Sequence, residues 1–322
     1  MNHRPPLLFA SLLLVIAAAS ACGTKNAGEA DGNSTTATTT NTTRTPSANA
    51  TAAPAAETPR SALKPGEIPF SGFPPVNTTA QADEVVLAPS YIWIQDAATK
   101  GPDKVTFIWY NQKMVAPGEV ESEVEFLQPG KAKIPNAYII PIPAAQTVKT
   151  GDLVLTWWQS GSGMKRAIVV ESADPMQPTV RYLDIAYDNP AKSPDGKTTI
   201  GQMDEKLKPN SFVRLTSPWE PGTVLAVNDG ASRKPVKIIR VAGDKILTLN
   251  SAGSLKVYDK ADATPVPLRP NVKAGDKVKA PQYGTYADAI VIRVDSRNGR
   301  VFVKFGTNPE EKAVAFGDVM TN

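Results

Sequence analysis

Trp157 and Trp158, in the stretch LVLTWWQSGSG, are the side chains whose types and spacing most suggest a binding surface. Successive residues of a β-strand point to opposite faces, so one indole would face a core and the other would lie outside or at the rim. An exposed indole gives rigid contact area at low entropic cost and suits a sugar or a partner chain. Packing within and across the sheet is the alternative role, and the more frequent one for such a pair.

Alternating glutamates form a second candidate set in the stretch GEVESEVEF. A strand would place these four carboxylates on one face, opposite Val120, Val124 and Phe126: Glu119, Glu121, Glu123 and Glu125. Carboxylate oxygens suit Ca²⁺, and a carboxylate pair could serve a glycosidase. The stretch has no EF-hand pattern and nothing selects a pair, so we expect a solvated outer face, no metal and no cofactor.

Histidine and cysteine are almost missing from the chain, which has one of each, His3 and Cys22. His3 lies in an N-terminal segment that we expect to be removed. Without it, Ser-His-Asp and Cys-His catalytic sites and zinc sites built on imidazole or thiolate are excluded. We therefore expect no enzyme, while chemistry by carboxylates, Lys, Ser or Tyr stays open.

Positive charge is spread along the chain, with 35 Lys and Arg against 31 Asp and Glu. No basic block indicates a nucleic-acid partner. Two basic pairs, Lys165-Arg166 and Arg233-Lys234, are expected in hairpin loops. They would be solvated there, with an anionic surface polymer as the alternative ligand.

The elements that must position these residues are short strands. From about Asp83 onward, β-branched and aromatic runs alternate with Gly-, Asn- and Asp-containing turns, which predicts an all-β sandwich or small barrels. Expected strands include VVLAPSYIWIQ, KVTFIWYNQ, VESEVEF, DLVLTWW, RAIVVES, TVRYLDIAY, KIIRV, KILTLN, SLKVYD, AIVIRVD and RVFVKF. The stretch SRNGRVFV predicts a hairpin with a tight Asn-Gly turn. Only TTIGQMDEKL, near Thr198, predicts a short helix.

An internal repeat organises the strands. Similar openings begin at Val148, Leu207 and Val272, about sixty residues apart, which is the size of a five-stranded SH3-like barrel. A unit this small buries a marginal core, so we expect neighbouring units to pack together. The region 83–146 supplies four more strands and is too divergent to assign as a copy.

The last unit resembles the Tudor/Agenet class of SH3-like barrels. The matching residues are Gly275, Asp276, Val278, Ala280, Tyr286, Ala289, Val291, Val303 and Phe305, followed by a Gly306-Thr307-Asn308 turn. The resemblance implies an aromatic cage of Tyr283, Tyr286 and Phe305 that holds a methylated cation by cation–π attraction. Thr307 stands where a further aromatic is expected, so the cage would be incomplete.

The N-terminus predicts export. A short apolar run from Leu7 to Ala19 ends in small residues, as a secretion signal does. The segment from Ala19 to Cys22 resembles the lipobox of bacterial lipoproteins, which implies lipidation of Cys22. Gly23, in place of Asp, implies transport to an outer membrane if the cell has one. The Thr-, Ala- and Pro-rich stretch that follows cannot bury enough apolar area to order itself.

We therefore expect an all-β chain of tandem small SH3-like (Tudor/Agenet-like) barrels after a signal peptide and a disordered linker. The expected divisions are a signal peptide (1–21), a linker (22–82), a β-rich unit (83–146), two SH3-like barrels (147–206 and 207–270) and a Tudor/Agenet-like barrel (271–322). The expected function is non-catalytic: the chain would be held to the membrane by its N-terminal lipid and would bind an envelope protein or glycan. The alternative is an envelope enzyme, or enzyme accessory, that acts on cell-wall polymer through carboxylates.

Overall fold

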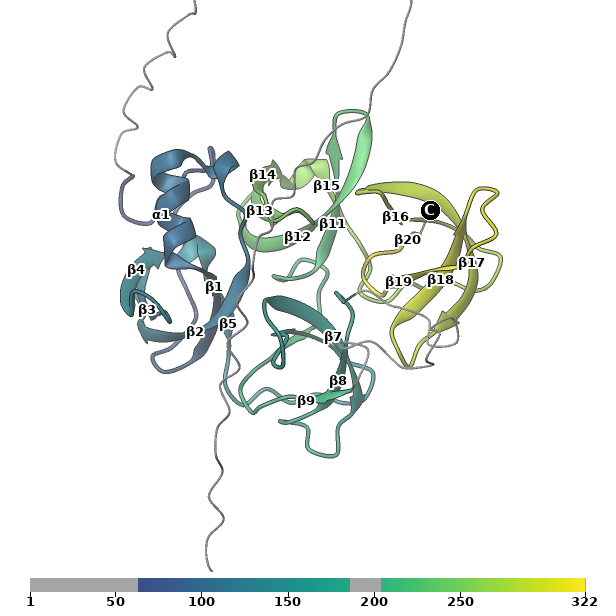
Figure 1. Ribbon diagram of the computed structural model, residues 1–322, viewed down its shortest axis with the longest axis horizontal. Helices are drawn as coiled ribbons and strands as arrows, with labels where there is room; N and C mark the ends of the chain where they lie inside the picture. The colour runs from purple at the N-terminus through teal and green to yellow at the C-terminus, as the bar shows by residue number, and fades with distance from the viewer. Residues whose placement is uncertain (1–62, 186–203, 322) are drawn as a thin grey trace, which may run out of the picture. The chain divides into compact units, whose positions relative to one another are not determined.

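The protein is all-β and contains four five-stranded antiparallel sheets (Figure 1). The computed structural model describes residues 63–185 and 204–321. Within these ranges, no helix has the length and apolarity needed to span a membrane. The expectation of an all-β chain is confirmed.

The first two sheets share one strand order. The first has the order β4-β3-β2-β1-β5 and contains β1 (Val85–Pro89), β2 (Trp109–Ala116), β3 (Glu121–Glu125), β4 (Lys131–Pro135) and β5 (Ile140–Ile142). The second has the order β10-β6-β7-β8-β9 and contains β6 (Leu153–Trp157), β7 (Met164–Glu171), β8 (Thr179–Tyr182), β9 (Glu205–Lys206) and β10 (Val213–Leu215). In each, four strands form a meander and the fifth returns to pair with the first.

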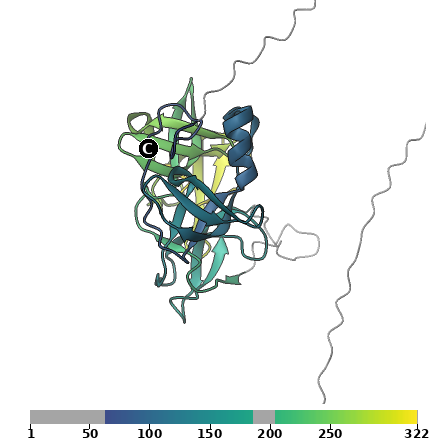
Figure 2. The ribbon, with the colours of Figure 1, turned by 90° about the vertical axis from the view of Figure 1, so that its left-hand side faces the viewer.

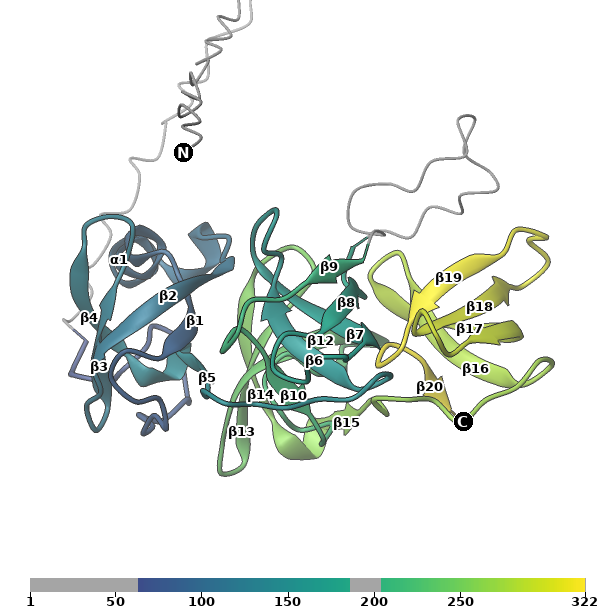
Figure 3. The same ribbon diagram turned by 90° about the horizontal axis from the view of Figure 1, so that it is seen from below.

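The other two sheets repeat this order. The third contains β11 (Val224–Asp229), β12 (Ser232–Ala242), β13 (Lys245–Leu249), β14 (Leu255–Asp259) and β15 (Ala263–Pro265). The fourth, which Figure 3 shows in yellow-green and yellow, contains β16 (Lys277–Gln282), β17 (Thr285–Asp295), β18 (Arg300–Phe305), β19 (Lys312–Ala315) and β20 (Met320–Thr321). The region before residue 147, which the sequence pattern leaves unassigned, thus has the same strand order as the rest.

One turn precedes the first strand of every sheet. In the second sheet the Gly151 N–H donates to the Val169 carbonyl over 2.7 Å, and the Val169 N–H donates to the Asp152 carbonyl over 2.9 Å. The other three sheets have the same two hydrogen bonds. The N–H groups of Asp83, Gly222 and Gly275 donate to the carbonyls of Met114, Ile238 and Val291, respectively. The N–H groups of Met114, Ile238 and Val291 in turn donate to the carbonyls of Glu84, Thr223 and Asp276. A β-bulge follows the second residue of each pair. The turn and the bulge therefore recur together as one structural motif in all four sheets.

The segment at Leu207 differs from expectation. It leads into β10, the last strand of the second sheet, which pairs with β6. The second sheet therefore extends to Leu215, beyond the expected division at residue 206. The counterpart of the Gly-Asp turn in the third sheet is Gly222-Thr223, which has the same hydrogen bonds with a different sequence.

A helix, α1 (Tyr91–Lys100), occupies a stretch that the sequence pattern assigned to a strand (Figure 2, blue). Pro89 ends β1, and the Ile94 N–H donates to the Ser90 carbonyl to open the helix. Ile94 and Ala97, three positions apart, are the buried residues of this helix, so the apolar spacing is helical although the residues are β-branched and aromatic. The helix expected near Thr198 lies mostly outside the described residues, and Glu205–Lys206 at its end form β9.

Single-turn 3₁₀ helices are described at Pro102–Lys104, Asn136–Tyr138 and Lys260–Asp262. The second and third of these stand directly before the last strands of their sheets, β5 and β15. They therefore carry the chain from the end of the meander back to the first strand.

The hairpin predicted at SRNG joins β17 to β18, but its loop has four residues between the paired Asp295 and Arg300. The Asn298 side chain donates to the Asp295 carboxylate over 2.7 Å, and Gly299 has φ 62°. The hairpin is confirmed, but its turn is longer than the expected tight turn, and of the Asn-Gly pair only Gly299 has a positive φ.

Residues 63–82 are part of the described fold. Ile68, Phe70 and Phe73 are buried, and the Phe70 and Phe107 ring centroids lie 6.1 Å apart. This part of the expected linker therefore packs on the first sheet, because its aromatic residues find a core there.

Candidate functional site

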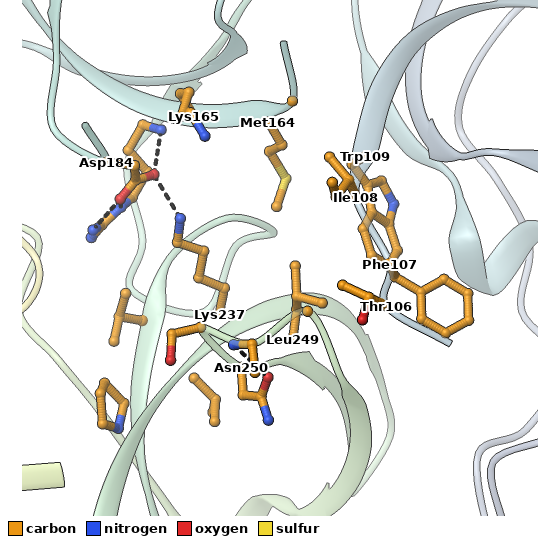
Figure 4. A pocket seen from close by; sticks show the side chains of 18 of the residues that line it. Thr106, Phe107, Ile108, Trp109, Met164, Lys165, Asp184, Lys237, Leu249 and Asn250 are labelled. Atoms are coloured by element: carbon orange, nitrogen blue, oxygen red, sulfur yellow. Dashed lines mark hydrogen bonds and ion pairs between the residues drawn. The ribbon is translucent and has the colours of Figure 1, made fainter. Parts of the chain in front are cut away.

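A pocket of about 500 Å³ is lined by residues of all four sheets or their adjoining loops (Figure 4). The first sheet supplies Thr106 to Trp109, the second supplies Gly163 to Arg166 and Asp184, the third supplies Val224, Pro235 to Lys237 and Leu249 to Gly253, and the fourth supplies Pro281 and Asp318. This volume is within the range of about 300–1,000 Å³ that is usual for small-ligand sites.

A glycine turn holds one wall in place. The Gly253 carbonyl accepts the Phe107 N–H over 2.7 Å, and Gly253 has φ 82°. A Cβ at Gly253 would lie 2.5 Å from the Thr106 Cγ2. Asn250 accepts the backbone N–H groups of Ala252 and Ser254, each over 2.9 Å, which fixes the turn. Glycine is therefore required where these two segments meet.

Arg166 is the buried centre of the charged wall. Its side chain is 3% exposed, and its Nη2 lies 2.7 Å from Asp184 Oδ1 and 2.8 Å from Asp318 Oδ1. Burial disfavours the guanidinium charge, but the two carboxylates outweigh it and raise the pKa of Arg166. Gly317 leaves room for this arrangement, because a Cβ there would lie 2.7 Å from Arg166 Nη1.

Asp184 is fully engaged by cations and by a backbone amide. Its Oδ2 accepts the Arg166 backbone N–H over 2.7 Å and lies 2.8 Å from Lys237 Nζ. Burial opposes its charge, but Arg166 and Lys237 together hold the pKa of Asp184 well below its usual value. Asp318 has fewer cationic partners, and its burial raises its pKa against the opposing effect of Arg166.

Lys165 is the third cation of the pocket wall. Burial, and then the charge of Lys237, lower the pKa of Lys165, while Asp184 opposes the shift. Among the described residues, no carboxylate lies within ion-pair distance of Lys165 Nζ. Three cations thus line the pocket with two carboxylates, and positive charge is in excess.

An apolar wall is formed by Phe107, Ile108, Trp109, Met164 and Leu249 (Figure 4). Ile108 is 40% exposed, whereas the other four are buried or half-buried. Phe107 and Trp109 are fixed by ring contacts and by the Trp109 Nε1–H, which donates to the Tyr138 carbonyl over 2.8 Å. The wall is therefore rigid behind an accessible isoleucine.

The two adjacent tryptophans lie near this pocket but do not line it. Trp157 is 8% exposed and belongs to the core, where it pairs across strands with Met164. Trp158 is half-buried; it contacts the Tyr182 ring, and its Nε1–H donates to Ser160 over 2.9 Å. The two indoles thus meet different apolar clusters: Trp157 belongs to the main core, and Trp158, directly after β6, packs on a second cluster within the same sheet.

The three aromatic residues of the expected cage are not brought into one open site. Tyr283 is 96% exposed at the turn between β16 and β17, with φ 49°. Tyr286 packs against an apolar cluster that includes Val224, and its hydroxyl is enclosed without a hydrogen-bond partner among the described residues. Phe305 is 8% exposed. Only one of the three rings is therefore free to contact a cation from solvent.

Two of the three glutamates of β3 lie opposite lysines, and Glu121 lies opposite Pro135. Glu123 is opposite Lys133 and Glu125 is opposite Lys131 in the register of β3 and β4. Within the described ranges, no group of three His, Cys, Asp or Glu residues is arranged to hold a metal ion.

The basic pairs lie in strands, and the expectation of hairpin loops is wrong. Lys165 and Arg166 are in β7, and Arg233 and Lys234 are in β12. Lys234 Nζ lies 2.7 Å from the Asp229 carboxylate. The loop assignment fails because β7 and β12 begin earlier than the apolar runs suggest.

The sequence contained one signal for the charged wall. In the strand sequence MKRAIVV, Arg166 lies on the same face as Met164 and Ile168, both of which are buried. The alternation of side chains along the strand therefore indicates that Arg166 also faces a core. Asp184, Lys237 and Asp318 are isolated charges far apart in the chain, and nothing local marks them. Cys22 lies outside the described residues.

The chain is similar to solved structures but matches no family model. No family model matches the chain, and no curated protein matches it. Among solved structures, it is similar to the tandem Agenet domains 3-4 of ADCP1, with 20% identity and a TM-score of 0.20, covering 32% of this chain and 80% of that one. It is also similar to AGD34 of Arabidopsis thaliana AGDP1, with 20% identity and a TM-score of 0.21, covering 32% of this chain and 82% of that one. TM-scores this low carry no argument about the fold or the ligand of this chain.

Proposed function

We propose that this chain is a lipid-anchored, non-catalytic binding protein of the cell envelope. Cys22 would carry the lipid, and the protein would be exported to an outer membrane if the cell has one. An envelope protein or glycan would be the partner, and one of its groups would enter the pocket. The segment from Cys22 toward residue 63 would act as the stalk, so tethering would raise the effective concentration of the site.

The observation that carries this proposal is that all four sheets contribute to one pocket, which a single sheet could not form. Arg166 connects the second and fourth sheets at its charged wall, and the Phe107–Gly253 hydrogen bond connects the first and third at its apolar wall. A site assembled in this way is largely pre-formed, which reduces the entropic cost of binding.

We further propose that each sheet is an SH3-like unit of the Tudor/Agenet type. Support comes from the common strand order, in which the fifth strand returns to the first, and from the 3₁₀ turns before β5 and β15. The shared turn and bulge also support four copies of one unit.

Binding is tested by capture from an envelope extract with the full-length Cys22→Ser chain. Ile108→Trp places a large side chain at the accessible wall of the pocket, and Ile290→Trp makes the same change at a site that is 46% exposed and does not line it. A partner retained by the parent chain and by Ile290→Trp, but lost with Ile108→Trp, is the expected result. Equal capture by both variants would place the binding elsewhere.

The anchor has its own test. Intact mass measurement of the wild-type protein should show an acyl adduct that Cys22→Ser lacks, and only the wild type should sediment with membranes. An unmodified wild-type mass would rule out the anchor and leave the pocket proposal standing.

One observation favours the alternative of a carboxylate enzyme: Asp184 and Asp318 lie in one pocket with pKa values shifted in opposite directions, as acid–base pairs are. The hydrogen bonds of Asp184 weigh against it, because both of its oxygens are occupied by Arg166 and Lys237. Release of reducing ends from cell-wall polymer, abolished by Asp318→Asn, would establish the enzyme. No release from any polymer fraction would leave the binding function.

A further inference from the structure

We propose that the pocket binds an organic anion with an apolar body, and that Lys165 receives the anionic group. This inference deepens the proposed binding function and rests on it. The anionic group would be a carboxylate, sulfonate or phosphate, and the body would be aromatic or aliphatic. On the envelope partner, this group would be part of an acyl chain or of a compact aromatic acid, and the two sources are distinguished by competition below.

The charges of the pocket wall favour an anion. Asp184 pairs with both Arg166 and Lys237, and Asp318 pairs with Arg166. Lys165 is left half-buried with no carboxylate in ion-pair distance among the described residues. A partly buried charge without a partner is costly, because water solvates it poorly. An incoming anion would supply the missing charge partner of the Lys165 ammonium group and would be stabilised by it.

The position of Lys165 joins the charged wall to the apolar one. A Cβ on Gly163 would lie 3.9 Å from Lys165 Nζ and 3.1 Å from the Ile108 Cγ2. The ammonium group and the accessible isoleucine therefore flank the same glycine. In Figure 4 the Lys165 side chain reaches toward the space between Asp184 and Met164. A ligand whose charge met Lys165 would place its body against Ile108, Met164 and Leu249.

Other ligand classes fit less well. A methylated cation would be repelled by the positive excess from Lys165, Arg166 and Lys237. A neutral apolar molecule would displace water from Lys165 and return no hydrogen bond. Charge-assisted hydrogen bonds are stronger than neutral ones, so the anion gains most from this wall.

Two dyes with a similar aromatic body test the proposal on the full-length Cys22→Ser chain. 8-Anilinonaphthalene-1-sulfonate is anionic, and N-phenyl-1-naphthylamine is its neutral counterpart. Lys165→Met keeps most of the aliphatic stem and removes the charge, Lys165→Arg keeps the charge, and Lys133→Met removes an exposed lysine outside the pocket. Binding is measured by fluorescence titration, and folding is checked by thermal unfolding of each variant.

The expected result is an anion affinity at least about tenfold weaker in Lys165→Met, with the neutral dye little changed. Lys165→Arg should keep the anion affinity, and Lys133→Met should match the parent. Ile108→Trp should weaken both dyes. Unchanged anion binding in Lys165→Met, an equal loss of both dyes, or no binding of the anionic dye by the parent would overturn the proposal.

The source of the ligand is separated by competition. Displacement of the anionic dye by dodecanoate indicates an acyl chain, and displacement by 3-phenylpropionate indicates a compact aromatic acid; either agrees with the proposal. The envelope capture described above has an independent outcome. A partner whose capture depends on Ile108 but not on Lys165 would preserve the proposed function and reject the anion.

Discussion

Arg166 and Asp318 lie 152 positions apart in the chain, yet the Arg166 Nη2 donates to the Asp318 Oδ1 over 2.8 Å. Arg166 is in β7 of the second sheet, and Asp318 lies two residues before β20 of the fourth. A second arginine repeats this connection: Arg300 of the fourth sheet donates to the carbonyls of Tyr182 and Leu183 in the second. Buried guanidinium groups therefore stabilise the junction of these sheets as well as shaping the pocket.

Arg166→Met should lower the free energy of unfolding by about 3–5 kcal/mol, because it leaves the buried Asp184 carboxylate and the partly buried Asp318 carboxylate without their main cation. Chemical denaturation followed by tryptophan fluorescence measures this loss. Lys279→Met, which breaks an exposed ion pair with Asp288, should cause no measurable change. Equal effects of the two substitutions would show that the buried cluster adds no stability.

Asp184 should make the free energy of unfolding depend on pH in the acid range. Its pKa in the folded protein is held below the ordinary value of 3.8 by Arg166 and Lys237, so the unfolded chain binds the proton more readily. The stabilisation is therefore complete above pH 3.8 and is lost as pH falls from there toward the folded-state pKa. Unfolding free energies measured from pH 6 to pH 2 should fall at the acid end, and Asp184→Asn should flatten that fall.

Asp318→Asn is the control for this acid dependence. Burial raises the pKa of Asp318, so the folded state binds its proton more readily than the unfolded chain. Its contribution has the opposite sign and lowers stability as pH rises above 3.8. Asp318→Asn should therefore leave the loss of stability toward pH 2 in place. An acid loss that disappears with Asp318→Asn and persists with Asp184→Asn would reverse this assignment.

The free energy of unfolding should depend on the backbone conformation of the first residue in the turn that precedes each sheet. Gly275 has φ 91°, and a Cβ added there would meet no heavy atom within 4 Å. Gly275→Ala should therefore cost about 1–2 kcal/mol, the strain of an L-residue in the left-handed region. Asp83 occupies the same turn position in the first sheet with φ 68° and pairs with Lys113 on the surface. Because an exposed ion pair adds little stability, the relief of backbone strain should dominate in Asp83→Gly. Thermal unfolding of both variants checks the opposite signs.

The same turn shows how far the sequence can predict this fold. Gly-Asp at 151–152 and at 275–276 is visible as a repeat, since both turns use the residue types that a positive φ favours. Gly222-Thr223 and Asp83-Glu84 make the same hydrogen bonds with other residue types. The sequence pattern therefore took Leu207, instead of Gly222, as the opening of the third unit, and it did not identify the turn of the first unit. The backbone geometry is what the units share, and several sequences satisfy it.

The candidate site was less predictable for a different reason. Aromatic residues attract attention in a sequence, but Trp157 and Phe305 are buried in the core, and Tyr286 packs against an apolar cluster that includes Val224. The pocket depends on isolated charges and on residues from all four sheets, brought together only by the packing of those sheets. Arg166 alone carried a local signal, because it falls on the apolar face of its strand.

Gly253→Ala should separate pocket geometry from general stability. The added Cβ would lie 2.5 Å from the Thr106 Cγ2 and 3.1 Å from the Phe107 carbonyl oxygen, so the wall must shift. Gly243 is the matched control, because it also has positive φ, 60°, but a Cβ there meets nothing within 4 Å. Both alanine variants should lose about 1–2 kcal/mol from backbone strain, as thermal unfolding would show. Only Gly253→Ala should also weaken dye binding, since it displaces the segment that presents Ile108. Equal dye affinity in the two variants would mean that this turn does not define the pocket.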